Sequence, residues 1–280
     1  MLGGGNMVNR KDFHHNFLKS IIVRLDFQVV LETEVEEKVL PHVKSFAKEK
    51  GFSRYLEKNI SQIDIALTNK ETPESIATKN NLRNQKIYSF TDENRGFVLD
   101  ISNTFVCLQI NTVHYTPFDD YSDIVPSVSK FYMDNIDFFA VKRFGIRKIN
   151  ECLIEDKNKI QQFFNPSYFN FYNNIEAVNT IQSNHTDIFT CETCHVNFIT
   201  NIAQVQLENK PQYKIHLDID AYLDKSEDIS LLLGEPAKMA EINDLIFKIY
   251  TSSLTDGFIS SLISDDDFDS TVMIGVERND

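Results

Sequence analysis

The stretch from Phe17 to Phe27 most constrains what this chain can fold into, because hydrophobic residues recur at every second position from Ile21 to Phe27. Successive side chains of a β-strand point to opposite faces of the sheet, so this spacing predicts a strand that is buried on one face. The buried face is predicted to carry Ile21, Val23, Leu25 and Phe27, and the other face Ile22 with Arg24 and Asp26, a potential ion pair.

The order of the predicted elements repeats along the chain, although the residues themselves show no repeat. Each half contains an antiparallel meander followed by a long helix. This order predicts an α+β fold with long helices packed on one face of one or two antiparallel sheets. In the first half we predict strands at 17–27, 86–91, 96–101, 104–115 and 139–154, helices at 34–50 and 119–137, and a polar loop at 67–84. In the second half we predict strands at 177–182 and 213–222, a hairpin at 188–205 and a helix at 235–263.

These elements divide the chain into four segments. Residues 1–15 are expected to be a disordered leader, and residues 16–155 an N-terminal α+β half. Residues 156–264 are expected to form a C-terminal α+β half. Residues 265–280 are expected to be a solvated acidic tail, because such a run of carboxylates is typical of a frayed chain end; it includes Asp265, Asp266, Asp267 and Asp269.

The charge of the chain limits its partners. A formal net charge of −13 argues against an extensive nucleic-acid-binding surface, because Lys and Arg contacts to phosphates supply most of the non-specific affinity. No stretch approaches the roughly 18 apolar residues of a membrane helix, and the N-terminus lacks the pattern of a secretory signal. We therefore expect a cytoplasmic protein without membrane contact, in which the four cysteines stay reduced.

The motif Cys191-Glu-Thr-Cys194-His195 has the C-x-x-C-H spacing of covalent haem attachment. That attachment takes place outside the reducing cytosol, so the expected compartment argues against it. Zinc is the alternative, because Cys191, Cys194, His195 and His185 offer four suitable ligands if a turn separates the cysteines. No second pair of ligands lies at finger spacing, and we favour reduced cysteines that pack as small buried residues.

The most basic stretch, from Lys142 to Asn150, contains a second candidate site. On a strand, Arg143, Gly145 and Arg147 share one face, and the glycine leaves room between two guanidinium groups. Together with Asn150 they form a candidate clamp for a nucleotide or another anion. We favour the alternative that both arginines pair with internal carboxylates, for which the candidates are Asp26, Asp218 and Asp220.

A third candidate site is acidic. Asp218 and Asp220 are two residues apart on a predicted strand, so their carboxylates share a face and are able to bind magnesium. The D-x-D pattern alone is weak, because charged residues on the exposed face of a strand produce it equally well.

Three stretches, at 16–27, 142–150 and 245–255, resemble a sporadically distributed family of uncharacterised bacterial proteins. Its members are similar in length and carry a central Arg-x-Gly-Leu-Arg-Tyr-Ile-Asn motif. The resemblance implies a bacterial cytoplasmic protein from mobile or defence-associated genes and supplies no catalytic residues. The motif is matched here by Arg143, Gly145, Arg147, Ile149 and Asn150, with Ile146 in place of Leu and Lys148 in place of Tyr.

Common catalytic motifs are missing from the sequence, among them the phosphate-binding loop, the dinucleotide fingerprint, the G-x-S-x-G elbow and H-E-x-x-H. We therefore expect a non-enzymatic subunit or sensor that binds a protein partner, in a bacterial antiviral or toxin–antitoxin-like system. A homo-oligomer is compatible with this, and no cofactor is expected. The alternative is a nucleotide- or anion-binding sensor or enzyme that uses Arg143 and Arg147, with zinc or magnesium as a metal.

Overall fold

The computed structural model describes residues 9–65, 80–112, 116–169, 182–192, 194–207, 210–264 and 272–274. Ten strands in these ranges form one antiparallel sheet. They are β1 (Leu18–Phe27), β2 (Arg54–Ile65), β3 (Asn80–Asp92), β4 (Phe97–Ile101), β5 (Phe105–Asn111), β6 (Val141–Ile154), β7 (Gln182–Thr190), β8 (His195–Leu207), β9 (Lys210–Leu223) and β10 (Val272–Ile274). Nine of them follow the order β2-β3-β4-β5-β1-β6-β9-β8-β7, and β10 pairs with β6.

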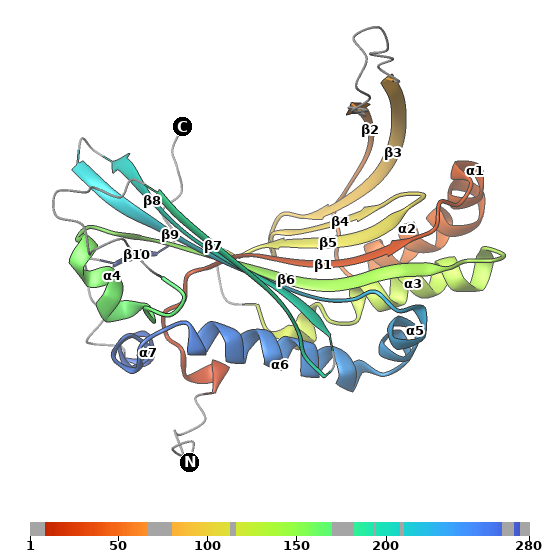
Figure 1. Cartoon of the computed structure of the whole chain (residues 1–280). Helices are drawn as coiled ribbons and strands as arrows, with labels where there is room; N and C mark the ends of the chain where they lie inside the picture. The colour runs from red at the N-terminus through yellow and green to blue at the C-terminus, as the bar shows by residue number, and fades with distance from the viewer. Residues whose placement is uncertain are drawn as a thin grey trace, which may run out of the picture.

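The helices cover one face of the curved sheet and leave the other face open, which confirms the predicted α+β architecture (Figure 1). Within the described ranges they are α1 (Glu32–Glu34), the π-helical η2 (Val35–Val39), α2 (Leu40–Glu49), α3 (Ile124–Asn135), α4 (Lys157–Phe163), α5 (Ser226–Gly234), α6 (Pro236–Ser252) and α7 (Asp256–Ile263), with 3-10 turns η1 (Arg10–Asp12) and η3 (Phe118–Asp120).

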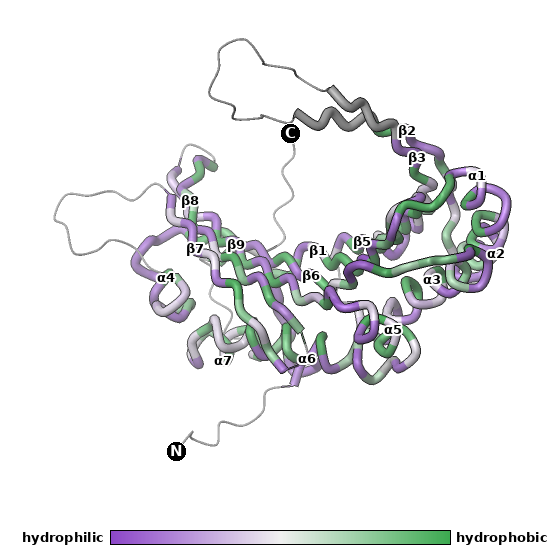
Figure 2. The backbone as a smooth tube through the Cα atoms, turned by 45° about the vertical axis from the view of Figure 1, so that its right-hand side comes forward, coloured by the Kyte–Doolittle hydropathy of each residue, from purple (hydrophilic) through white to green (hydrophobic). Residues whose placement is uncertain are grey.

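A single continuous hydrophobic core joins the sheet to its helices. α3 packs on β1 and β5, and α6 packs on β6 and β9. The predicted alternation in β1 is confirmed, since Ile21, Val23, Leu25 and Phe27 are at most 2% exposed. Figure 2 shows the same alternation of hydrophobic and hydrophilic residues along the central strands.

Strands β1 and β6 lie side by side at the centre of the sheet, and each begins a similar unit. β1 is followed by helices and by the meander β2 to β5, whose last strand returns to pair with β1. β6 is followed by α4 and by the meander β7 to β9, whose last strand pairs with β6. The order of elements therefore repeats, with β1 and β6 as the first strands of the two units. The division of the chain at residue 155 stays a prediction.

The predicted helix at 34–50 is present from Glu32 to Glu49, but its middle is π-helical. Leu40 N donates to Val35 O, five residues back. Pro41 explains this irregularity, because proline has no N–H to donate and its ring crowds the carbonyl four residues earlier. Gly51, with φ of +89°, ends the helix as predicted.

The predicted single helix at 235–263 is wrong, because the chain forms two helices, α6 and α7. Thr255 caps α7 by accepting a hydrogen bond from Phe258 N at 3.2 Å. Asn165 N donates to Ser253 O at 2.9 Å, so the gap between the helices is hydrogen-bonded to another segment. Leu254 and Phe258 are buried on either side of this cap. The helical spacing of hydrophobic residues therefore continues through the break, and the sequence pattern does not reveal it.

Besides β10, one strand and two helices were missed, and two predicted elements lie mostly outside the described ranges. β2 is a polar edge strand, and α4 and α5 are short, so none has a strong hydrophobic period. β3 begins at Asn80, inside the predicted loop at 67–84, and the rest of that loop lies outside the described residues. The predicted strand at 177–182 also lies outside them, except for Gln182 in β7.

Both chain ends differ from the prediction wherever they are described. Residues 9–15 of the predicted leader are ordered: the backbone N–H groups of His14 and His15 both donate to Leu262 O at 3.0 Å. In the predicted acidic tail, residues 272–274 form β10 on β6. The remainder of the leader, 1–8, and most of the tail lie outside the described residues.

Candidate functional site

The basic stretch of β6 sends alternate side chains to the two faces of the sheet. Phe144 and Ile146 are fully buried under the helices, whereas Arg143 and Arg147 lie on the open face. Opposite them β9 carries acidic residues on the same face. We call the charged residues that contact one another there the open-face network: Lys19, Arg143, Arg147, Glu151, Lys214, His216, Asp218 and Asp220.

Gly145 makes room for the Arg143 side chain. A Cβ atom at this position would lie 2.9 Å from Arg143 Nη1, so the guanidinium group occupies the space that the sequence suggests for an anion. Arg143 Nη2 donates to both oxygens of Asp220, at 2.9 and 2.8 Å. The guanidinium carbon also lies 4.6 Å from the centre of the Tyr222 ring. The space beside Gly145 is therefore filled by the protein itself.

Arg147 and Asp218 form a second, bidentate pair. Arg147 Nε and Nη2 donate to the two carboxylate oxygens at 2.8 and 2.5 Å. Burial by itself would raise the pKa of Asp218, but the hydrogen bonds from Arg147 and the nearby His216 imidazole, 3.9 Å away, outweigh burial and lower it. The Asp218 side chain is only 4% exposed, so this carboxylate depends on its partners to remain charged.

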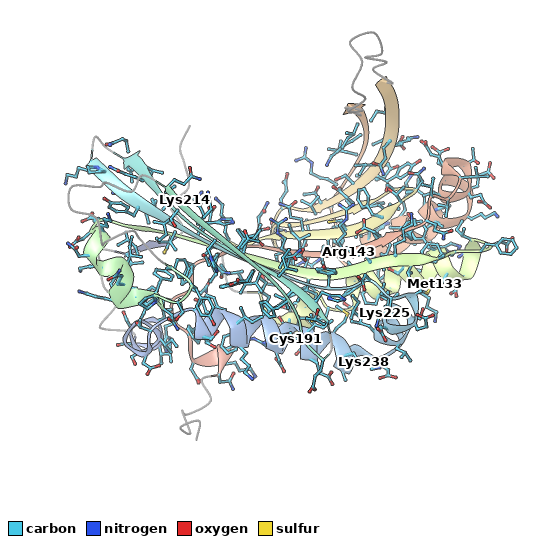
Figure 3. The ribbon with its side chains drawn as sticks, viewed as in Figure 1. Met133, Arg143, Cys191, Lys214, Lys225 and Lys238 are labelled. Atoms are coloured by element: carbon cyan, nitrogen blue, oxygen red, sulfur yellow. The ribbon has the colours of Figure 1, made fainter. Side chains whose placement is uncertain are left out.

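Glu151 is the centre of the other half of the network. Its carboxylate contacts Lys19 Nζ at 2.6 Å, Lys214 Nζ at 2.7 Å and His216 Nδ1 at 3.1 Å. The carboxylate of Asp218, 3.9 Å from His216 Nε2, and the hydrogen-bonded carboxylate of Glu151 raise the pKa of His216 to about 9, so the imidazole is protonated at neutral pH. Figure 3 labels Arg143 and Lys214, which lie at the two ends of this network.

The favoured pairing of Arg143 and Arg147 with Asp220 and Asp218 is thus present, while Asp26 pairs with Arg24 instead. An external anion or a magnesium ion at these residues must first displace an internal partner. The anion clamp and the magnesium site therefore stay predictions.

Asn150, the fourth residue of the predicted clamp, lies on the other face of the sheet. It is buried and donates to Leu217 O at 3.3 Å. Two residues of a strand share a face only when an even number of positions separates them. Asn150 follows Arg147 by three positions, so the two side chains point to opposite faces of the sheet.

The C-x-x-C-H motif forms the turn of the predicted hairpin, between β7 and β8. Cys191 N donates to Cys194 O at 2.8 Å, and no cysteine in the described part of the chain is in a disulfide. His195 Nδ1 lies 3.0 Å from Thr190 Oγ1. His185 lies five residues before the end of β7, roughly 16 Å from the turn at about 3.3 Å per residue.

The predicted zinc ligands are therefore not brought together as a set of four. His185 lies 2.9 Å from Asp187 Oδ2 instead. Among the residues that the structure describes, no group of three or more Cys, His, Asp or Glu side chains is arranged to hold a metal ion. Cys194 is buried, as expected of a cysteine that packs as a small apolar residue.

A cluster of exposed hydrophobic side chains lies at the end of the sheet where β1 ends and β6 begins. Phe138 precedes β6 and is 99% exposed, and it lines a depression of about 600 Å³ together with Met133 and Ser230. Gln28 N donates to Ala140 O at 2.8 Å, so the segment after β1, which contains Val29 and Leu31, begins beside the start of β6. We call this cluster the end patch and define it as Val29, Leu31, Met133, Phe138 and Leu231, all at least 38% exposed.

Phe138 has an unfavourable backbone conformation. Its φ of +57° is the only positive value at a residue other than glycine in the described ranges. A bulky side chain in the left-handed region costs roughly 1–2 kcal/mol. Because the ring is almost fully exposed, packing within the chain does not repay this cost.

Sequence reasoning missed the end patch, Glu151 and His216. The end patch was missed because its residues come from three separate segments whose isolated apolar residues look ordinary in sequence. Two adjacent phenylalanines at the start of the strand predicted at 139–154, Phe138 and Phe139, were the available signal, since only one of them fits the buried face.

Comparisons of this chain with protein-family models, with curated proteins and with solved structures found no match. None of the described helices is both long and apolar enough to span a membrane. The function is therefore inferred from the features above.

Proposed function

We propose that this protein acts by binding another protein through the end patch, with Phe138 as the anchor. The partner offers an apolar pocket for the Phe138 ring, bordered by Lys or Arg side chains. The observation that carries the proposal is a fully exposed phenylalanine held in a strained backbone conformation. Aromatic side chains dominate the binding energy of many interfaces, because they bury a large area with few rotatable bonds.

The neighbours of Phe138 support an interface rather than an isolated exposed ring. Met133 borders the same depression, and Leu231 follows Ser230, which also lines it. Five of the eight large hydrophobic residues exposed in the described ranges belong to the end patch. Exposed apolar side chains that gather at one end of a molecule are typical of interaction sites. Figure 3 places Met133 at this end of the molecule, with Lys225 on the same side.

The charges around the end patch indicate the chemistry of the partner. Five exposed acidic residues close to the end-patch residues in sequence outnumber three exposed lysines, Lys130, Lys142 and Lys225. A basic rim on the partner would complement this excess of negative charge and accelerate association at low salt. The acidic residues are Glu32, Asp134, Asp137, Glu227 and Asp228.

Site-specific photo-crosslinking tests this proposal. A photoreactive phenylalanine analogue replaces Phe138 in cells of the source organism, and Ile188, which is 72% exposed on β7, serves as the control position. We expect one discrete cross-linked protein from position 138 and none from position 188. The same products from both positions, no product, or a second copy of this chain at position 138 would overturn the proposal.

Affinity measurements on the purified pair sharpen the test. We expect Phe138→Ala to weaken binding by about 30-fold or more, because truncation of a central aromatic anchor costs about 2 kcal/mol or more. Ile188→Ala should leave affinity unchanged, and higher salt should slow association. An affinity that survives Phe138→Ala would contradict the role of Phe138. The defence or toxin–antitoxin-like setting that the family resemblance implies stays a prediction.

The stability of the unbound protein gives an independent check. We predict that Phe138→Gly raises the free energy of unfolding by about 1 kcal/mol, because glycine adopts the left-handed conformation without the steric cost. Urea denaturation measures this change. Phe138→Ala, which keeps the strained backbone, is the control and should give a smaller gain. A loss of stability in Phe138→Gly would mean that the side chain packs within the chain.

A further inference from the structure

A small cavity of about 70 Å³ lies beneath the helix face of the sheet, between the N-terminal segment, β6 and α6. Phe13, Phe247 and Tyr250 form much of its apolar wall, and the ring centres of Phe13 and Phe247 are 5.7 Å apart. Arg10 and Lys148 contribute the two charged groups of the lining. The cavity thus has a largely aromatic lining with two cationic side chains, and it lies on the opposite face of β6 from the open-face network.

Hydrogen-bond donors in this cavity exceed their partners. Tyr250 is only 8% exposed, and its buried hydroxyl has no hydrogen-bond partner among the described residues. Arg10 Nε is also buried without a described partner. Lys148 Nζ donates to Asn243 Oδ1 at 2.6 Å, which uses one of its three protons. Buried donors without acceptors are costly, so the site is incomplete as it stands.

The cavity lining also has an excess of positive charge. Arg10 is paired with Asp244 at 2.8 Å, and the Asp244 side chain is 71% exposed, outside the cavity. Lys148 has no carboxylate within salt-bridge distance among the described residues. Burial and then the charge of Arg10 lower the pKa of Lys148 to about 7. A single negative charge beside Lys148 would supply the missing counter-charge and an acceptor for its free protons.

We propose that this cavity binds a small organic carboxylate with a short apolar body. The carboxylate accepts hydrogen bonds from Lys148 and the Tyr250 hydroxyl, and the apolar body lies against Phe13 and Phe247. A monoanion matches the one uncompensated cation, whereas the aromatic wall would leave the further charge and hydration of phosphate unsatisfied. The proposal is independent of partner binding at the end patch, because the two sites share no residue.

Isothermal titration calorimetry of the full-length protein with matched probes tests this inference. Butyrate carries the proposed charge and a short apolar body, butyramide is its neutral analogue, and inorganic phosphate is an anion without the apolar body. We expect butyrate to bind at least about tenfold more tightly than butyramide, because charge-assisted hydrogen bonds are the stronger ones. Phosphate should bind more weakly than butyrate. Equal affinities for butyrate and butyramide, or tighter phosphate binding, would overturn the proposal.

Two variants assign the binding to this cavity. Lys148→Met keeps the size of the side chain and should weaken butyrate binding by about tenfold or more, and Tyr250→Phe by about threefold to tenfold. Lys142→Met, at an exposed lysine on the same strand, is the matched control and should bind butyrate like the wild type. Wild-type affinity in folded Lys148→Met would place the ligand elsewhere and overturn the assignment. Circular dichroism confirms that each variant is folded.

Binding should also depend on pH, with Lys148 as the titrating group and Arg10 and Asp244 as its charged neighbours. Lys148 must be protonated to pair with the carboxylate, so affinity should fall as the pH rises above about 7. The Lys148→Met variant should lose this dependence. A pH dependence that persists in the variant would show that another group titrates.

Discussion

The basic residues on the two faces of strand β6 differ in whether the protein supplies them with acidic partners. On the open face, Arg143 and Arg147 are each paired with an aspartate of β9. On the helix face, Lys148 belongs to a cavity with more donors than acceptors. Both sets come from one stretch of nine residues. The comparison shows that a basic sequence motif alone does not locate a ligand site, because the partners supplied by other strands and helices decide which cations remain uncompensated.

The comparison also separates stability from binding. A network whose members satisfy one another contributes to folding, and removing one member leaves the others unpaired. A cavity with unsatisfied donors lowers the stability of the folded protein. Proteins retain such destabilising groups at sites that bind ligands, because the groups are needed for function. We therefore expect substitutions in the open-face network to destabilise the protein, and removal of an unsatisfied donor from the cavity to leave stability unchanged or to increase it.

The largest expected effect is that of Asp218→Ala. This substitution removes the partner of Arg147 and one of the carboxylates beside His216, so we predict a loss of about 3 kcal/mol in the free energy of unfolding. Urea denaturation at pH 7 measures it. Asp224→Ala is the control, because Asp224 is 52% exposed beside His195 and its removal should cost less than about 1 kcal/mol. Similar losses in both variants would remove the distinction between the network and an ordinary surface pair.

The second prediction uses the opposite pH dependence of the two faces. The pKa of His216 is raised from 6.5 to about 9, so its contribution to stability is complete below pH 6.5 and is lost as the pH rises through 9. The pKa of Lys148 is lowered from 10.5 to about 7, so the cost of its charge in the folded state is relieved as the pH rises from 7 toward 10.5. Between pH 7 and 8 these contributions nearly cancel.

Each variant should therefore reveal one of the two slopes. Relative to wild type, stability should fall with rising pH in Lys148→Met and rise with pH in His216→Gln, by up to about 1.4 kcal/mol per pH unit. Urea denaturation at several pH values from 7 to 8 measures both slopes. Parallel curves for the wild type and either variant would show that the corresponding group does not titrate as the structure indicates.

The third prediction concerns the space beside Gly145. A Cβ atom in Gly145→Ala would displace the Arg143 guanidinium from Asp220 and from the Tyr222 ring. We expect a loss of about 1 kcal/mol, since this pair is partly exposed and the arginine is able to move. Gly234→Ala, where nothing lies within 4 Å of the added atom, is the control and should not destabilise the protein. Unchanged stability in Gly145→Ala would mean that the Arg143 contacts contribute little.

The smallest expected effect is that of Tyr250→Phe. The hydroxyl lost in this variant has no described partner, so we predict a change in the free energy of unfolding within about 0.5 kcal/mol or a small gain. Tyr132→Phe is the matched control, because that buried hydroxyl donates to Ser102 O at 2.8 Å and its loss should cost about 1 kcal/mol or more. Equal losses in the two variants would show that the Tyr250 hydroxyl is satisfied in solution.

Part of the candidate sites could be predicted from the sequence. The two-residue period places Arg143 with Arg147, and Asp218 with Asp220, on shared strand faces, and β6 and β9 proved to be neighbours. The same period excludes Asn150 from that face. The cavity could not be predicted, because Arg10 and Tyr250 are 240 residues apart and no local pattern records that the N-terminal segment packs on α6.

The sequence by itself determined the one-sided strands, the α+β class and the repeated order of the elements, because alternation and helical period are local properties of the chain. Only the tertiary structure decided that β1 and β6 meet at the centre of one sheet, that the helix at 235–263 is broken, and that Phe138 is exposed. Strand order, hydrogen bonds between distant segments and burial depend on contacts between residues far apart in the chain, and a local pattern carries no information about them.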